Sequence, residues 1–162
     1  MSRSKFIVEH IRLTALKPFD EFISAFEGQL GRFEEDVYRE LEDGVDPASV
    51  RDRLEGMAGP SGFMLFRKID HGELLRIVGE PRKAMQYLVG NPLLAIEMTR
   101  HAIGAGLYAP LRVLIHEVED GKTCVEYDLP SSLFGQFEDD RVSRVAAMLD
   151  RKLEDLVTTA AA

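Results

Sequence analysis

The 162-residue chain has 45% hydrophobic and 30% charged side chains and a formal net charge of −8. These values fit one globular domain over residues 1–162, and the negative charge argues against nucleic-acid binding, which requires a concentrated basic face. Cys124 is the only cysteine, and no apolar run has the length of a signal peptide or a membrane span. We therefore expect a cytoplasmic protein without a nucleic-acid or membrane partner.

The first third of the chain predicts a strand followed by helices. Residues 5–15 interleave branched apolar and polar side chains, which is typical of a half-exposed strand. Pro18 can begin a helix whose apolar residues recur at helical spacing as far as Asp43-Gly44, as one long helix or as two kinked pieces. Asp46-Pro47 begins a further short helix. The charged segment over about residues 33–60 is therefore expected to be a helical insertion in the domain.

The middle of the chain predicts three strands and a capped helix. Residues 63–69 and 74–78 have the composition of strands, and they flank a turn that contains His71. Residues 83–89 form a further strand candidate. Asn91 is a favourable N-cap and is followed by Pro92, which predicts a helix over about residues 92–103.

Asp120-Gly121 predicts a hairpin between strands at 111–118 and 123–128. A two-residue loop pairs positions whose numbers sum to 241, which places His116 on one face with Tyr127 and places Cys124 on the opposite face. Pro130 and the two serines after it predict a turn, and Asp139 or Asp140 caps a last amphipathic helix. The element order predicts an α+β domain with an antiparallel sheet covered by helices on one face.

The histidines and the cysteine give little support for catalysis by metal or thiol. The four histidines show no HxH or HxxxH spacing, so we predict no metal site and no cofactor. Carboxylates near Cys124 are expected to raise the pKa of its thiol, which favours a structural role.

Three motifs carry a family resemblance: YLVGNP at 87–92, GLYAPLRV at 106–113 and YDLPSS at 127–132. Through them the chain resembles the domain-of-unknown-function 302 family. The resemblance implies a TATA-binding-protein-like arrangement, in which a curved antiparallel sheet of about five to six strands is covered by helices. It also implies a frequent dimer, whereas the family has no settled activity.

Two functional hypotheses follow. The first is a non-enzymatic module that binds a small, partly apolar ligand or a protein partner between the sheet and its helices. The candidate ligand-binding residues are His71, Asn91, Tyr108, Arg112, His116 and Tyr127. The alternative is a small enzyme that uses the same residues except His116, since they include a base, a phenol and an anion clamp.

A homodimer is the third expectation. In the predicted register, Leu111, Val113 and Ile115 form an apolar row on the sheet face opposite the helices. Such a row is too apolar to be left in contact with water. Either the 34–58 segment or a second copy of the chain could bury it.

Overall fold

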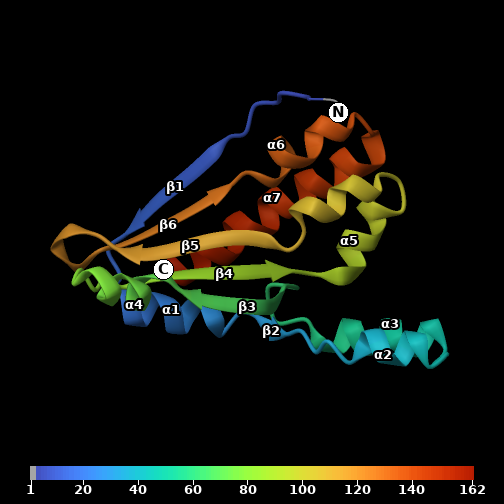
Figure 1. Ribbon diagram of the computed structural model, residues 1–162, viewed down its shortest axis with the longest axis horizontal. Helices are drawn as coiled ribbons and strands as arrows, with labels where there is room; N and C mark the ends of the chain where they lie inside the picture. The colour runs from blue at the N-terminus through green and yellow to red at the C-terminus, as the bar shows by residue number, and fades with distance from the viewer. Residues whose placement is uncertain (1–2) are drawn as a thin grey trace.

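A computed structural model describes residues 3–162 of the protein (Figure 1). The strands are β1 (His10–Ala15), β2 (Gly31–Arg32), β3 (Met64–Asp70), β4 (Ala84–Gly90), β5 (Leu111–Glu117) and β6 (Thr123–Asp128). The α-helices are α1 (Phe19–Glu27), α2 (Val37–Glu42), α3 (Pro47–Met57), α4 (His71–Leu74), α5 (Pro92–Thr99), α6 (Pro130–Phe134) and α7 (Asp140–Ala161). Short 3₁₀ segments are η1 (Leu75–Val78), η2 (Ile103–Tyr108), η3 (Glu119–Gly121) and η4 (Gly135–Phe137).

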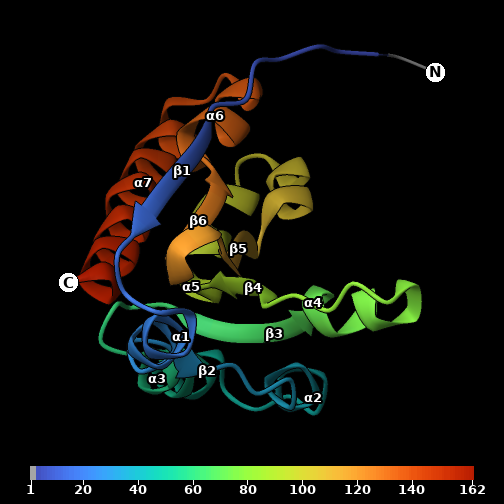
Figure 2. The same ribbon diagram turned by 90° about the vertical axis from the view of Figure 1, so that its left-hand side faces the viewer.

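The six strands form one curved sheet in the order β1-β6-β5-β4-β3-β2. Every neighbouring pair is antiparallel except the short parallel contact between β2 and β3. Figure 2 shows α7 and α1 on the same side of this sheet. The predicted α+β class, with a curved sheet covered by helices, is therefore confirmed.

The main core lies between this sheet and helices α1 and α7. Phe22 and Phe26 recur at helical spacing on α1, and both are fully buried. On α7, Leu149 and Leu153 are buried in the same cluster. The Asp139 carboxylate caps α7 by accepting the backbone N–H of Arg141 at 2.8 Å, which satisfies a helix-end donor that would otherwise lack a partner.

The register of the β5–β6 hairpin differs from the prediction by one residue. Paired positions sum to 240, as in His116 opposite Cys124, because the loop holds three residues rather than two. Asp120 and Gly121 both adopt positive φ, and the N–H of Val118 donates to the carbonyl of Lys122 at 2.8 Å. Since strand side chains alternate between faces, this shift moves Cys124 to the same face as His116.

The corrected register removes the apolar row on which the homodimer prediction rested. Leu111, Val113 and Ile115 point toward the helices and belong to the main core, together with Val125 and Tyr127. Ile115 has no exposed surface. The proposed interface on this row is therefore wrong, because α1 and α7 of the same chain already cover it.

The segment over residues 74–78 is helical, which corrects the prediction of a strand there. Asp70 ends β3 and its Oδ1 accepts the N–H of Glu73 at 2.8 Å, so the chain turns into α4 and then η1. His71 is the first residue of α4 and does not occupy a hairpin turn. Within the described chain, no strand pairs with residues 74–78 through backbone hydrogen bonds. An apolar composition without such a partner does not make a strand.

The predicted helix over residues 18–44 is also interrupted. Helix α1 ends at Glu27, and strand β2 begins at Gly31. The N–H of Gly31 donates to the carbonyl of Phe63 at 2.9 Å. A Cβ at Gly31 would lie 1.7 Å from the carbonyl oxygen of Met57, so only glycine allows this close approach. The chain then forms α2 and α3, which supply the helices expected over residues 33–60.

Two smaller boundaries differ as well. Helix α5 begins at Pro92 as predicted but ends at Thr99, and η2 follows it. Pro130 begins the short helix α6 rather than a turn.

Candidate functional site

An apolar pocket of about 360 Å³ lies where β4 ends and β5 begins. The α2–α3 hairpin and α5 both contribute lining residues. Figure 1 shows these two elements at the same end of the sheet. Its lining residues are Phe33, Val37, Tyr38, Leu41, Leu54, Phe66, Gly90, Asn91, Pro92, Leu94, Ala95, Ile96, Met98, Ala109, Pro110, Leu111, Phe134 and Leu149. This size falls within the range of small-molecule sites, roughly 300–1,000 Å³.

Two separate hydrophobic clusters build this pocket. Met98 and Leu149 belong to the main core and form part of the buried lining. Phe33, Leu54 and Phe66 belong to a second cluster between the α2–α3 hairpin and the sheet. The rings of Phe33 and Phe66 stack with centroids 4.3 Å apart, an arrangement that aromatic pairs favour. The pocket therefore exists only where the helical insertion meets the sheet.

The mouth of the pocket is also apolar. Tyr38, Leu41 and Ile96 line it with 57%, 49% and 43% of their surface exposed. A contiguous apolar surface around a concave opening is typical of a binding site, because water otherwise contacts these side chains at a cost in free energy.

Arg53 holds the α2–α3 hairpin in place. Its guanidinium pairs with three carboxylates, those of Glu34 at 2.6 Å, Asp36 at 2.8 Å and Glu40. The hydrogen bond from Arg53 lowers the pKa of Asp36. The guanidinium thus joins the segment before α2, helix α2 and helix α3, and positions one wall of the pocket.

The pocket lining carries almost no polar chemistry. None of its residues is charged, and Asn91 supplies the only side-chain amide. The Oδ1 of Asn91 accepts the N–H of Leu93 at 2.9 Å, while its Nδ2 donates to the carbonyl of Gly62 at 2.9 Å. An amide has two donor hydrogens and two acceptor lone pairs, so one of each is left for a ligand.

A second constellation lies on the open face, by which we mean the sheet face opposite α1 and α7. We call it the open-face cluster, and its members are His10, Arg12, His116, Cys124, Glu126 and Asp128. The strand register brings these residues side by side across β1, β6 and β5.

Glu126 is the centre of the open-face cluster. Its carboxylate accepts hydrogen bonds from His10 Nε2 at 2.8 Å, His116 Nε2 at 2.9 Å and Arg12 Nη2 at 3.2 Å. The bonds from His10 and then His116 lower the pKa of Glu126 to about 2. Glu126 is therefore a carboxylate at neutral pH, and it carries the negative charge on which the cluster is organised.

Glu126 shifts the pKa of two neighbouring side chains, His10 and Cys124. Hydrogen bonds to Glu126 and then to Asp128 raise the pKa of His10 above its ordinary value. Burial, followed by the charge of Glu126, raises the pKa of the Cys124 thiol. The expected direction for Cys124 is thus confirmed, and a free thiol here is a weak nucleophile.

The residues predicted to bind a ligand fall into separate places. Arg112 and His116 lie on the open face, where Arg112 Nη2 is 3.6 Å from Asp128 Oδ2. His71 lies near the edge of this face, with its Nε2 3.2 Å from Gln86 Oε1.

The other three candidates lie elsewhere. Asn91 borders the apolar pocket. Tyr127 lies on the opposite sheet face in the main core, where burial raises its pKa. Tyr108 lies in η2 with its ring edge-on to Phe134 and Phe137, each 6.2 Å away between centroids. The structure therefore does not bring the six residues together in one site.

Neither the apolar pocket nor the open-face cluster was predicted from the sequence, for identifiable reasons. The predicted register placed Cys124 on the face opposite His116 because the predicted loop was one residue too short. The i, i+2 spacing of Cys124 and Glu126 was a usable signal once the register was known. The pocket wall at Phe33 and Phe66 depends on contacts between segments that no local pattern connects.

The architecture and its site define a class: an α+β domain with a helix-covered curved sheet and an apolar pocket at the sheet end. Residues 38–160 match the family described as "Domain of unknown function DUF302". The protein belongs to this family, which confirms the resemblance seen in its motifs.

A solved structure supports the fold. The chain is similar to an uncharacterized conserved protein DUF302 from Bacillus stearothermophilus, with a TM-score of 0.65 and 17% sequence identity. The match covers 93% of this chain and 97% of the other. A comparison with curated proteins found no match. Within residues 3–162, no helix combines the length and apolar character needed to cross a membrane. The TATA-binding-protein-like arrangement stays a prediction.

Proposed function

We propose that the protein is a non-enzymatic binding module for a small, uncharged and largely apolar ligand. The observation that carries this proposal is the apolar pocket itself, whose lining holds no charged residue and whose mouth exposes apolar side chains. A ligand there would bury apolar surface at about 25 cal/mol per Å². Asn91 would orient the ligand through the donor and acceptor that its capping bonds leave free.

Binding is favoured over catalysis because the pocket lacks reactive groups. A general acid or base must lie within hydrogen-bond reach of the reacting atoms, and Tyr38 at the mouth is the only titratable lining residue. The residues of the enzyme alternative, His71, Asn91, Tyr108, Arg112 and Tyr127, are distributed over the open face, the core and the pocket. This separation supports a binding role.

Filling the pocket should abolish binding. Ala95 lines the pocket from α5, so Ala95→Phe places a ring in the cavity while leaving the helix intact. We expect Nile red, an uncharged apolar dye, to bind the wild-type protein with increased fluorescence and to bind Ala95→Phe at least about tenfold more weakly, a loss of about 1.4 kcal/mol.

The matched control is Ala48→Phe, an exposed position on α3 outside the pocket. It should bind the dye like the wild type, with both variants retaining the native circular dichroism spectrum. Equal dye affinity of Ala95→Phe and the wild type would place binding elsewhere and contradict the proposal.

We also propose a homodimer, now on a different surface. The projecting α4–η1 segment exposes Leu74, Ile77 and Val78, which are 57%, 84% and 68% exposed. Adjacent apolar side chains of this kind support self-association, and closed twofold dimers are the commonest soluble oligomers. Light scattering should give twice the 18.2 kDa chain mass, and Ile77→Glu should reduce the mass to that of one chain. A wild-type mass of one chain at micromolar concentration would refute this dimer.

A further inference from the structure

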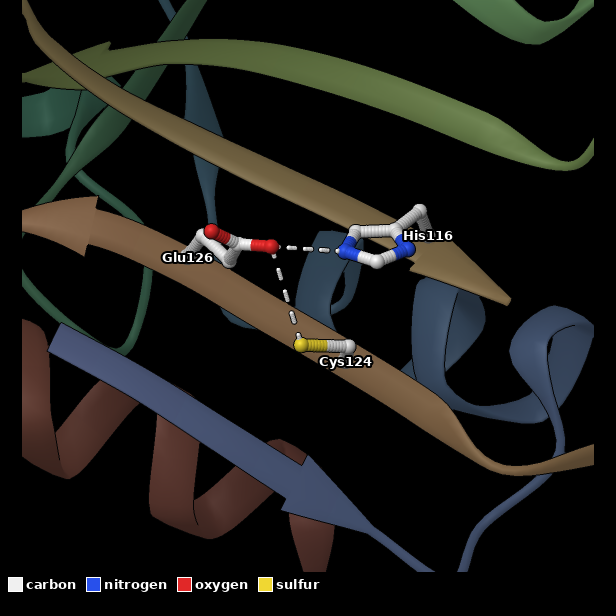
Figure 3. A group of neighbouring side chains, drawn as sticks. All are labelled: His116, Cys124 and Glu126. Carbon is white, nitrogen blue, oxygen red and sulfur yellow. Dashed lines mark hydrogen bonds and ion pairs between the residues drawn. The ribbon is translucent and has the colours of Figure 1, made fainter. Parts of the chain in front are cut away.

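We propose that His116, Cys124 and Glu126 form a binding site for one thiophilic divalent metal ion of the zinc type. Figure 3 shows the three side chains pointing toward one another from β5 and β6. One ligand atom from each residue, the imidazole nitrogen, the thiol sulfur and a carboxylate oxygen, lies within 4.8 Å of the other two. This site is separate from the apolar pocket, which shares no residue with it.

The spacing of the ligand atoms suits a small tetrahedral ion. Zinc bonds of 2.0 to 2.3 Å require ligand atoms roughly 3.3–3.8 Å apart. His116 Nε2 lies 2.9 Å from Glu126 Oε1, and Cys124 Sγ lies 3.9 Å from the same oxygen. The third separation, between Nε2 and Sγ, is within 4.8 Å, so the side chains must rotate to bring all three separations to the required value.

Regular strands hold all three ligands. His116 and Cys124 are cross-strand partners in the β5–β6 ladder, and Glu126 follows Cys124 by two residues on the same face. Ligands on regular strands are positioned more precisely than ligands on loops. The chain therefore presents the three donors without having to fold a loop around the ion.

The charges and tautomers also suit a divalent cation. Thiolate and carboxylate together neutralise two positive charges, and a bound cation deprotonates a coordinating thiol. His116 Nδ1 lies 3.3 Å from the carbonyl oxygen of Glu117. Without the ion, His116 Nε2 donates to Glu126, so metal binding releases this proton to solvent. A proton on Nδ1 then leaves the lone pair of Nε2 facing the ion, the usual arrangement of a metal-binding histidine.

His10 and Arg12 border the site from strand β1. His10 Nε2 contacts the other carboxylate oxygen of Glu126 at 2.8 Å, whereas Arg12 Nη2 lies 3.2 Å from the proposed ligand oxygen Oε1 and 3.3 Å from Oε2. His10 can keep its contact while Oε1 binds the ion, so we assign it as a positioning residue. Arg12 must give up its bond to Oε1 and can keep the one to Oε2. The side chain of His116 is 25% exposed and that of Glu126 is 15% exposed, whereas Cys124 is buried, so the ion would enter from the side of His116 and Glu126.

The test uses the 162-residue chain without a histidine tag, treated with chelator and titrated with Co²⁺. We expect one equivalent to bind with tetrahedral visible bands and a sulfur-to-cobalt charge-transfer band, and Zn²⁺ to displace it. Cys124→Ser should remove the charge-transfer band, and His116→Ala should weaken Co²⁺ binding by more than about 100-fold. His10→Ala should keep the band and weaken binding roughly 10–100-fold, as the loss of an outer-shell partner does.

The matched control is His71→Ala, which removes a histidine near the same face but outside the site. It should bind Co²⁺ like the wild type. Thermal melts of each metal-free variant establish that it is folded before titration. The proposal is overturned if the wild-type chain binds no Co²⁺, if the charge-transfer band survives Cys124→Ser, or if folded His116→Ala binds as tightly as the wild type.

Discussion

Ile115→Glu should unfold the protein rather than separate a dimer. Ile115 has no exposed surface and lies in the main core, so the substitution removes an apolar side chain and buries a carboxylate without a partner. We expect a loss of about 5 kcal/mol or more in the free energy of unfolding, comparable to the total stability of many domains. Circular dichroism and urea titration should show a chain that is largely unfolded without denaturant.

Leu88→Glu is the matched control for this result. Leu88 lies on the open face of the neighbouring strand β4, between the cross-strand residues Arg67 and Arg112. The same substituent there meets water and two guanidinium groups, so stability should change by less than about 1 kcal/mol. A folded, soluble Ile115→Glu protein would show that the sheet faces are assigned the wrong way round.

Asn91→Ala should cost about 2–3 kcal/mol, more than an ordinary helix cap. Removing the acceptor for the Leu93 N–H costs about 1 kcal/mol. The same substitution leaves the partly buried carbonyl of Gly62 without its donor, which adds roughly 1–2 kcal/mol. Urea titration of the two proteins measures the difference in unfolding free energy.

Asn91→Ser separates these two contributions. Serine caps a helix as well as asparagine does but is too short to reach the Gly62 carbonyl. We expect its loss to be about half that of Asn91→Ala. Equal losses for the two variants would mean that the bond to Gly62 contributes all of the stability and the cap none.

The outcome for Asn91 shows how far local patterns reach. Asn91 and Pro92 predicted the start of α5 correctly, because capping and the φ of proline are properties of a few adjacent residues. The bond from Asn91 to Gly62 joins residues 29 positions apart, and no local pattern indicates it. The same limit applies to the pocket, whose wall at Phe33 and Phe66 forms only when the insertion packs on the sheet.

The hairpin shows a different limit. Asp120-Gly121 located the turn correctly, since both residues adopt positive φ. The length of the loop determines which side chains of β6 face the core. A difference of one residue exchanged the side chains of β6 between the core and the open face. The sequence therefore indicated which residues were strands but not that His116, Cys124 and Glu126 lie together.

The sequence by itself determined the α+β class and most strands, because hydrophobic periodicity, caps and turn residues act over short distances. Its three motifs also indicated the family. Tertiary structure alone decided that residues 74–78 are helical, that α1 ends at Glu27, and that Ile115 is core rather than interface. It also decided where the two candidate sites lie. Each of these depends on contacts between distant segments, such as the approach of Gly31 to Met57, whose free energy no short stretch of sequence contains.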